Sequence, residues 1–253
     1  MTTASAASTT TAASTTALGP RARSGTPRPR TAGSTGRDLG AAAGVATGYN
    51  VIVDPPHPLE LALQESDRFF MHTSSRHRAA RALDQRLRAA GIDYAICGAF
   101  AVAAYGHERF TRDVDVLVTR EGLARFKAEW LGRGYLERVP GGRGLRDTEN
   151  GVDLDFLVSG DFPGDGRPKP VAFPDPQAAG VEAVELRVLT LPRLIELKLA
   201  SGMSAPHRLQ DLADVLALIR VNTLARDLAA ALDPWVRDKY EELWQAAQTA
   251  PGE

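Results

Sequence analysis

The sequence predicts an α/β (α+β) fold in which a small mixed β-sheet has helices packed on one side and an α-helical region ends the chain. Two observations predict it. Short apolar or alternating runs of strand type are separated by longer segments in which apolar residues recur at helical spacing. Hydrophobic residues make up 43% of the 253 residues, which is enough for a sizeable core.

The chain is expected to divide into a disordered low-complexity tail at residues 1–57, a main domain at residues 58–221 and a C-terminal helical extension at residues 222–253. The first 48 residues are rich in Thr, Ala and Ser, and Asp38 is their single acidic residue. They offer too few large apolar side chains to offset the entropy lost on folding. A transit peptide is a weaker alternative, because no amphipathic helix is evident there.

Charge, cysteine content and hydropathy exclude several classes of function. The net charge of -1 creates no overall field that would attract nucleic acid or an anionic membrane, although a local basic patch would still allow a nucleic-acid partner. Cys97 is the single cysteine, which rules out an intrachain disulfide and a zinc site built from cysteines. This cysteine usage fits a cytoplasmic location. No apolar run approaches the length of a membrane span, so no membrane partner is expected.

The periodicity of apolar residues predicts the order of the elements. Strands are expected at residues 94–97, 113–118, 152–158 and 184–189. Helices are expected at residues 59–72, 75–90, 99–105, 120–132, 191–201, 207–220 and 223–248. Residues 161–176 contain five prolines and two glycines, so they are expected to form an extended loop.

Two of the expected strands carry pairs of aspartates. One strand contains Asp113 and Asp115, and the other contains Asp153 and Asp155. Side chains two residues apart in a strand point to the same face, so neighbouring strands would gather three or four carboxylates on one patch of sheet. Oxygen ligands of this kind suit Mg²⁺, and two such ions can stabilise the attacking and leaving oxygens of an in-line displacement. The alternative is that Asp113 and Asp115 form the solvated face of an ordinary strand.

The segment before the first aspartate pair favours phosphoryl-transfer chemistry. A strand is expected to end at Cys97-Gly98 and a helix to start at Ala99, so backbone N–H groups there can bind phosphate. The aspartate strand begins shortly afterwards. A phosphate-binding turn followed by two carboxylate strands is the order that a phosphoryl-transfer site needs.

Two stretches that carry these features resemble a known signature: Cys97-Gly98-Ala99-Phe100-Ala101-Val102-Ala103-Ala104-Tyr105-Gly106 and Arg109-Phe110-Thr111-Arg112-Asp113-Val114-Asp115. The signature is that of the DNA-polymerase-β-type nucleotidyltransferase superfamily, in which Gly followed by Gly or Ser precedes a short helix and two aspartates that alternate with apolar residues. Within it, the chain is most similar to the AbiEii/MenT-like toxin nucleotidyltransferases and their small relatives. Residues 154–158, 194–200 and 208–215 resemble the family's third-carboxylate strand and downstream helices, so the resemblance covers roughly residues 80–220.

The resemblance implies that residues 58–221 form a nucleotidyltransferase domain with the nucleotidyltransferase fold. Such a domain transfers a nucleoside monophosphate from an NTP, such as ATP, to an acceptor hydroxyl and releases pyrophosphate. Asp113, Asp115 and Asp155 would hold two Mg²⁺ or Mn²⁺ ions, and Asp155 would help to deprotonate the acceptor. The residues implied for the NTP are Gly98, Ala99, Lys198 and Arg112, with Asp211 in a supporting role.

The acceptor stays open at this point. The resemblance allows a tRNA 3′ end, a protein hydroxyl or a small molecule such as an antibiotic. It also implies a toxin of a toxin–antitoxin pair, with a cognate antitoxin as a partner. The rival hypothesis is a catalytically silent module of the same fold that binds nucleotide or a partner protein; Ala99, where the family more often has Ser or Gly, favours it.

Several residues have simpler alternative roles. Asp153 could replace Asp155 as the third carboxylate, although apolar residues flank Asp155 on both sides, as in the family pattern. Lys198 lies among leucines and could simply extend along them to solvent. Asp211 and Asp214 could pair with Arg208 one turn away. The remaining basic residues near the aspartates, Arg109 and Arg112, could bind phosphate or pair with the carboxylates, and His107 is more typical of a turn.

Overall fold

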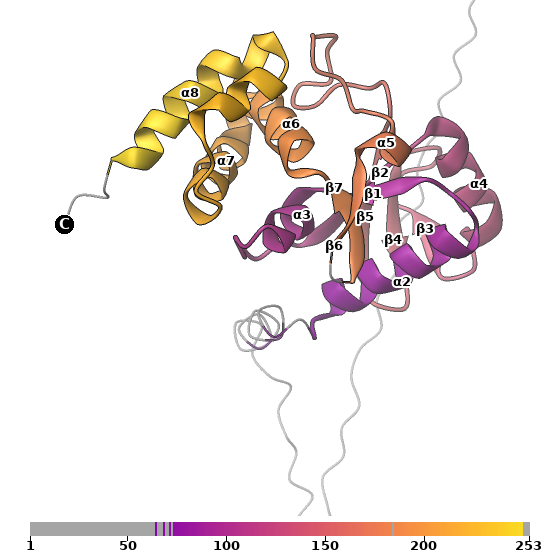
Figure 1. The fold of residues 1–253 in the computed structure, drawn as a ribbon. Coiled ribbons are helices and arrows are strands. Elements are labelled where there is room, and N and C mark those ends of the chain that lie inside the picture. The colour runs from indigo at the N-terminus through magenta and orange to yellow at the C-terminus, as the bar shows by residue number, and fades with distance from the viewer. Residues whose placement is uncertain (1–63, 65–67, 69–70, 72, 184, 250–253) are drawn as a thin grey trace, which may run out of the picture. The chain divides into compact units, whose positions relative to one another are not determined.

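The computed structural model describes residues 64, 68, 71, 73–183 and 185–249, all of which belong to the unit Asp54–Glu253 (Figure 1). The predicted tail at residues 1–57 lies outside the described residues, as does most of the predicted helix at residues 59–72. None of the helices formed by the described residues combines the length and the apolar character that crossing a bilayer requires.

Seven strands form one sheet: β1 (Tyr94–Ile96), β2 (Asp113–Val118), β3 (Tyr135–Glu137), β4 (Gly144–Asp147), β5 (Val152–Val158), β6 (Gly180–Ala183) and β7 (Leu186–Leu189). The α-helices of the described residues are α2 (Ser75–Ala89), α3 (Gly98–Ala104), α4 (Arg120–Trp130), α5 (Pro176–Ala179), α6 (Leu191–Ser204), α7 (Leu209–Val221) and α8 (Pro234–Gln248). Two 3₁₀ helices connect the last three: η1 (Pro206–Arg208) and η2 (Arg226–Ala231).

The sheet is mixed, which confirms the predicted α/β class. Its strand order is β3-β4-β5-β2-β1-β7-β6. The pairs β1–β7 and β2–β5 are parallel, whereas the other neighbouring strands are antiparallel. The C-terminal end of β1 therefore lies at the same end of the strands as the N-terminal ends of β2 and β5, where the aspartates are.

Alternation along β2 and β5 gives the sheet two different faces. The valines and other apolar residues of one face are buried, and helices α2 and α4 pack against this face. Phe126 of α4 shows how closely the layers fit: its ring lies 5.3 Å from that of Phe156 and 5.1 Å from that of Tyr135, centroid to centroid. Burial of this apolar surface, worth about 25 cal/mol per Å², holds the helices on the sheet. The opposite face carries the aspartates.

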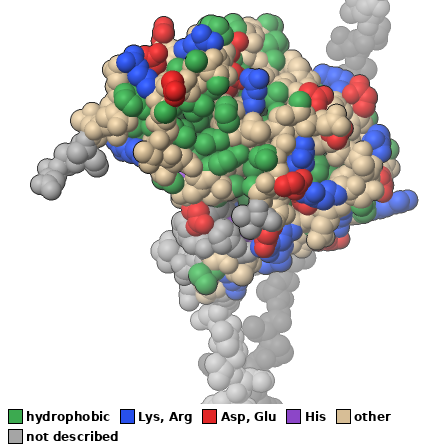
Figure 2. Space-filling model, in the orientation of Figure 1, with side chains coloured by type: hydrophobic (Ala, Val, Ile, Leu, Met, Phe, Trp, Pro, Cys, Tyr) green, Lys and Arg blue, Asp and Glu red, His purple; other side chains and the backbone are tan. Residues whose placement is uncertain are grey.

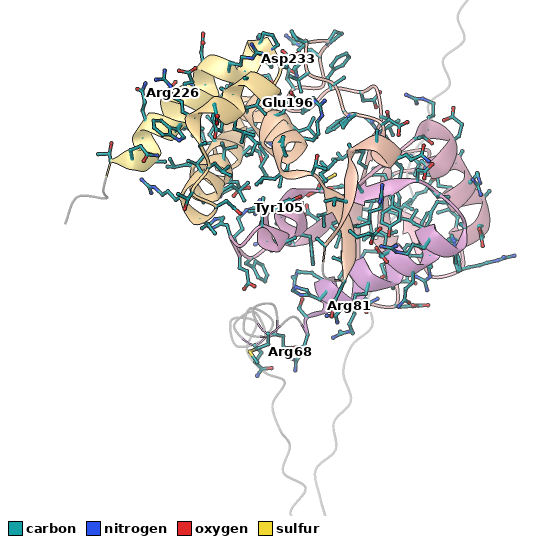
Figure 3. The ribbon with its side chains drawn as sticks, in the orientation of Figure 1. Arg68, Arg81, Tyr105, Glu196, Arg226 and Asp233 are labelled. Atoms are coloured by element: carbon teal, nitrogen blue, oxygen red, sulfur yellow. The ribbon has the colours of Figure 1, made fainter. Side chains whose placement is uncertain are left out.

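The predicted α-helical C-terminal region is confirmed, and α6, α7 and α8 pack together beside the sheet (Figure 1). Tyr105, after α3, joins them to the sheet: its hydroxyl donates to Leu189 O at 2.8 Å, and its carbonyl accepts from Asn222 Nδ2 at 2.9 Å. The buried Glu196 of α6 accepts from the Asp233 N–H at 2.7 Å, at the start of α8 (Figure 3).

The surface over α7 and α3 carries a group of hydrophobic side chains in the view of Figure 2.

The sequence-based prediction misses three short strands. β3 and β4 form a hairpin at the β5 edge of the sheet, and β6 extends the other edge. Each has only three or four residues, which is too short to show a period of two, and arginines and glycines interrupt the β3–β4 segment. The tertiary pairing, rather than local propensity, makes these segments strands.

The packing of the apolar face can be tested with Phe126→Ala. We expect it to lower the free energy of unfolding by about 3–5 kcal/mol, because a fully buried ring between two aromatic neighbours is removed. Equilibrium urea denaturation measures the change. Leu136→Ala is the control, since this side chain is 55% exposed and its truncation should change stability by no more than about 0.5 kcal/mol. Equal losses for the two variants would contradict the placement of α4.

Candidate active site

The four aspartates lie on two neighbouring parallel strands, β2 and β5. The sequence alone could not show that these strands are neighbours. In the register of β2 and β5, Asp113 is the partner of Asp153, and Asp115 is the partner of Asp155. Neighbouring strands are about 4.8 Å apart, so the paired residues face each other across one strand spacing. All four side chains are half-buried on the face that α2 and α4 leave uncovered. The carboxylates therefore gather on one patch of sheet, as predicted.

A cavity of about 820 Å³ opens over this patch. Asp113, Asp115 and Asp155 line it, whereas Asp153 is absent from its lining. Other walls come from the turn after β1, the start of β4, the loop after β5 and the helices α6 and α7. Among them are Cys97, Gly98, Arg109, Thr111, Arg143, Asp161, Phe162, Phe173, Leu197, Lys198, Ser201, His207, Arg208, Gln210 and Asp211. The cavity has the size of a typical small-molecule site.

Gly98, the first residue of α3, lies directly against the aspartate strand. Its φ is +57°, which favours glycine, and a Cβ there would overlap the carboxylate of Asp115. The preceding Cys97 N–H donates to Asp115 O at 2.9 Å. The glycine therefore lets the turn lie directly against Asp115, and any larger residue would displace one of them.

Burial and mutual repulsion raise the pKa of two of the carboxyl groups. Burial raises the pKa of Asp115 most, and the charges of Asp113 and Asp155 raise it further, to about 7, while Lys198 and Arg208 oppose the change. Burial also raises the pKa of Asp155, although the nearby Arg138 counteracts this effect. A site that brings carboxylates together in this way stabilises a bound cation, because the cation relieves the repulsion.

Asp113 and the β5 aspartates have partners in the structure. The buried Thr111 hydroxyl donates to Asp113 Oδ1 at 2.8 Å and so orients that carboxylate. Arg138, which directly follows β3, donates to Asp155 and has its Nη1 3.6 Å from Asp153 Oδ2. Arg146 on β4 donates to Asp153 Oδ1 at 2.7 Å. Of the two β5 aspartates, Asp155 lines the cavity. Asp153 lies outside the lining and pairs with Arg138 and Arg146, and we call this arginine-paired border of the cavity its rim.

The described residues contain no group of three or more His, Cys, Asp and Glu side chains arranged to hold a metal ion. The third carboxylate, that of Asp155, forms an ion pair with Arg138 instead. The donor set still fits Mg²⁺ in chemistry and placement, because three carboxylates from adjacent strands line one cavity. Binding of a cation by all three would require Asp155 to exchange its arginine for the ion.

Lys198 does not extend to solvent, which excludes the simpler role suggested for it. It is 6% exposed, and its Nζ lies 2.9 Å from Asp211 Oδ1 and 2.6 Å from Asp214 Oδ2. Burial alone would raise the pKa of these two carboxyl groups, but the lysine charge and several hydrogen bonds outweigh it and hold both below the ordinary value. Helices α6 and α7 are therefore joined by a buried ion cluster at the edge of the cavity.

Further donors surround this ion cluster. Arg208 Nε donates to Asp211 Oδ2 at 2.9 Å, as one alternative in the sequence analysis anticipated. Arg109 makes two hydrogen bonds to Asp214, of 2.8 and 3.0 Å, so it pairs with a carboxylate of α7 rather than with one of β2. Asp214 is fully buried and accepts from three side chains, which the sequence pattern does not indicate.

Two of the residues expected to bind NTP are absent from the cavity lining. Arg112 is exposed, and Ala99 is buried; neither belongs to the cavity lining. Arg208, considered from the sequence only as a partner of Asp211, does line the cavity, and its charge reaches Asp115 and Asp155. Thr111 and Arg138 were not predicted from the sequence to be site residues. Their positions beside aspartates depend on the turn before β2 and on the β3–β4 hairpin, and no local motif signals the latter.

Comparison with known proteins identifies no relative by sequence: no family model and no curated protein matches the chain. Three solved structures show a weak likeness. The solution structure of the antibiotic-resistance factor ANT(2'')-Ia is 16% identical, with a TM-score of 0.39 over 67% of this chain and 92% of that one. The crystal structure of ANT(2'')-Ia with adenylyl-2''-tobramycin is 18% identical, with a TM-score of 0.38 over 66% and 96%. JHP933 from Helicobacter pylori is 18% identical, with a TM-score of 0.39 over 75% and 91%. These likenesses assign the chain to no family.

Proposed function

We propose that the protein is a metal-dependent nucleotidyltransferase that transfers a nucleoside monophosphate from an NTP to an acceptor hydroxyl and releases pyrophosphate. One observation carries the proposal: Asp113, Asp115 and Asp155, which lie on two paired strands, line the same cavity as Lys198 and Arg208. Carboxylates that repel one another and two cationic side chains thus line one space. A metal-bound triphosphate satisfies both sets of charges.

The chemistry follows from these charges. The acceptor oxygen bonds to the α-phosphorus as the bond from that phosphorus to the bridging oxygen breaks, pyrophosphate leaves, and the hydroxyl proton passes to Asp155. Asp113, Asp115 and Asp155 would hold the metal ions, which would stabilise the attacking and leaving oxygens.

The remaining residues of the chain act by position and charge. Thr111 orients Asp113, and Gly98 keeps the turn after β1 against Asp115. Arg208 is half-exposed and uses its Nε for Asp211, so its other N–H groups can donate to phosphate oxygens. Lys198 supplies positive charge from its fixed place between Asp211 and Asp214.

The silent-module alternative has one observation in its favour, the contact of Arg138 with Asp155. In a module that binds no metal, this arginine would be the permanent counter-ion of the third carboxylate. The pKa of Asp115 argues against it, because a fold with no use for a cation would retain three repelling carboxylates around a buried position without benefit. A toxin role with a cognate antitoxin stays a proposal that rests on the family resemblance alone.

Asp115→Asn should stabilise the metal-free protein above pH 7. The folded pKa of about 7 lies above the ordinary 3.8, so the group's favourable contribution is complete below pH 3.8 and is lost as the pH rises through 7. The variant removes this loss and should raise the free energy of unfolding there by on the order of 2 kcal/mol. Urea denaturation across this pH range, with EDTA present, measures it. Asp153→Asn, which breaks ion pairs instead, should give no such gain; a destabilised Asp115→Asn would indicate a structural role.

Nucleotide binding should require a divalent cation, because the triphosphate and the aspartates repel each other without one. Titration calorimetry with ATP, CTP, GTP and UTP, in the presence of Mg²⁺ and after EDTA treatment, tests this requirement. We expect measurable heats only with the metal. Binding that survives EDTA unchanged would exclude the metal-site interpretation.

Transfer should depend on three of the four aspartates. We expect Asp113→Asn, Asp115→Asn and Asp155→Asn each to lower the rate by on the order of 100-fold or more, since each loses a metal-binding charge. Asp153→Asn is the matched control on the same strand and should retain most activity. The assay incubates each variant with labelled NTP and total cellular RNA and protein. Loss of activity with Asp153→Asn but not with Asp155→Asn would show that the third carboxylate is misassigned, and transfer by all four variants would refute the proposed mechanism.

A further inference from the structure

We propose that the acceptor carries a phosphate group near its reacting hydroxyl, and that Arg138, Arg143 and Arg146 of the β3–β4 hairpin bind this phosphate. The inference rests on the proposed function, since it concerns the substrate that approaches Asp155. It narrows the acceptor to one chemical class, phosphate esters. It also disfavours cationic acceptors.

The hairpin lies directly beside the proposed base. β4 pairs antiparallel with β5, with Gly144 opposite Asp155 and Arg146 opposite Asp153. Arg138 and Arg143 belong to the connection between β3 and β4, and Arg143 and Gly144 line the cavity. An acceptor hydroxyl within reach of Asp155 would therefore have Arg138, which pairs with Asp155, and Arg143, which lines the cavity, as its neighbours on the hairpin side, with Arg146 next to them at Asp153.

Each of the three arginines now contacts a carboxylate at the rim of the site. Arg138 donates to Asp155, Arg146 to Asp153, and Arg143 to Asp161 in the loop after β5. The arginine side chains are between 38% and 53% exposed and the carboxylates about one-third exposed. Ion pairs with this exposure contribute at most about 1 kcal/mol, so a ligand can replace either partner at little cost.

Gly144 provides the space in which Arg138 reaches the site. A Cβ at this position would overlap the Arg138 guanidinium, which lies across the glycine on its way to Asp155. The Arg138 guanidinium thus packs against the backbone of β4 at Gly144. If Asp155 were to hold a metal ion, the Arg138 guanidinium would lose this carboxylate partner and would be free to bind an anionic group of the acceptor.

Charge then decides which acceptors fit. With Asp113, Asp115 and Asp155 bound to cations, the hairpin would present three guanidinium groups against the two carboxylates of Asp153 and Asp161. Guanidinium forks match the geometry of phosphate oxygens and bind them by paired hydrogen bonds. A polycationic acceptor such as an aminoglycoside would instead meet like charges on this side. A phosphate diester next to an RNA 3′ end and a phosphate monoester on a small alcohol share the required chemistry.

Equilibrium binding to the full-length protein tests the proposal, with four probes: a labelled single-stranded RNA with a free 3′ hydroxyl, glycerol 3-phosphate, glycerol and tobramycin. We expect the RNA or glycerol 3-phosphate to bind and glycerol and tobramycin to bind more weakly. Arg138→Gln, Arg143→Gln and Arg146→Gln should each weaken the phosphate-bearing probe by roughly 3- to 10-fold. For RNA, each substitution should also make the negative slope of log affinity against log salt concentration smaller in magnitude by about 0.7.

Arg81→Gln is the matched control. Arg81 lies on α2, which covers the opposite face of the sheet, and its side chain is 39% exposed in an ion pair with Glu185 (Figure 3). Tight RNA binding with weak glycerol 3-phosphate binding would identify a nucleic-acid acceptor, and the reverse would identify a small phosphate ester. The proposal is wrong if neither phosphate-bearing probe binds or if tobramycin binds better than both. It is also wrong if the hairpin variants lose no more affinity for the phosphate-bearing probe than Arg81→Gln does.

Magnesium-dependent ATP binding, measured on the same wild-type sample, separates this inference from the proposed function. If ATP fails to bind while the hairpin arginines still bind the phosphate-bearing probe, the nucleotidyltransferase proposal fails and the arginine subsite stands. If ATP binds and the arginine substitutions have no effect on any acceptor, the subsite is wrong and the transferase proposal stands.

Discussion

The parallel pairing of β2 with β5 places Asp113 beside Asp153 and Asp115 beside Asp155 on one face of the sheet. Four like charges within two neighbouring strands repel one another, and the repulsion is strongest where burial also removes water, at Asp115. Much of the surrounding structure can be understood as a response to this repulsion. The opposite face, buried under α2 and α4, supplies the apolar contacts that hold the two strands together despite it.

Two sets of basic side chains lie near the aspartates: Lys198 and Arg208 in one set, and Arg138 and Arg146 in the other. Lys198 on α6 and Arg208 at the end of η1 line the same cavity as Asp115, and their charges oppose the rise in its pKa. Lys198 is itself held by two buried aspartates, so its position costs little additional entropy when a ligand arrives. On the rim, Arg138 and Arg146 neutralise the β5 aspartates through exposed, easily exchanged pairs. The fixed cations and the exchangeable ones therefore suit different tasks, charge placement and substrate contact.

The β3–β4 hairpin shows how a minor element of the sheet can govern chemistry. Its strands are short and lie at an edge, yet its register sets Gly144 against Asp155 and so brings an arginine to the third carboxylate. The loop after β5 contributes the partner of Arg143, Asp161, to the same rim. Neither segment has a regular apolar pattern, and both owe their positions to contacts with β5 and α6.

The sequence by itself determined the α/β class and the two aspartate pairs, because alternation and helical spacing are local properties of the chain. Only the tertiary structure decided that Asp115 faces Asp155, that Arg109 pairs with Asp214 and that Arg138 reaches the third carboxylate. These contacts join residues far apart in the sequence. Their geometry depends on strand register and on the packing of α6 against α7, and a shift of one residue in either would turn the same side chains to another face.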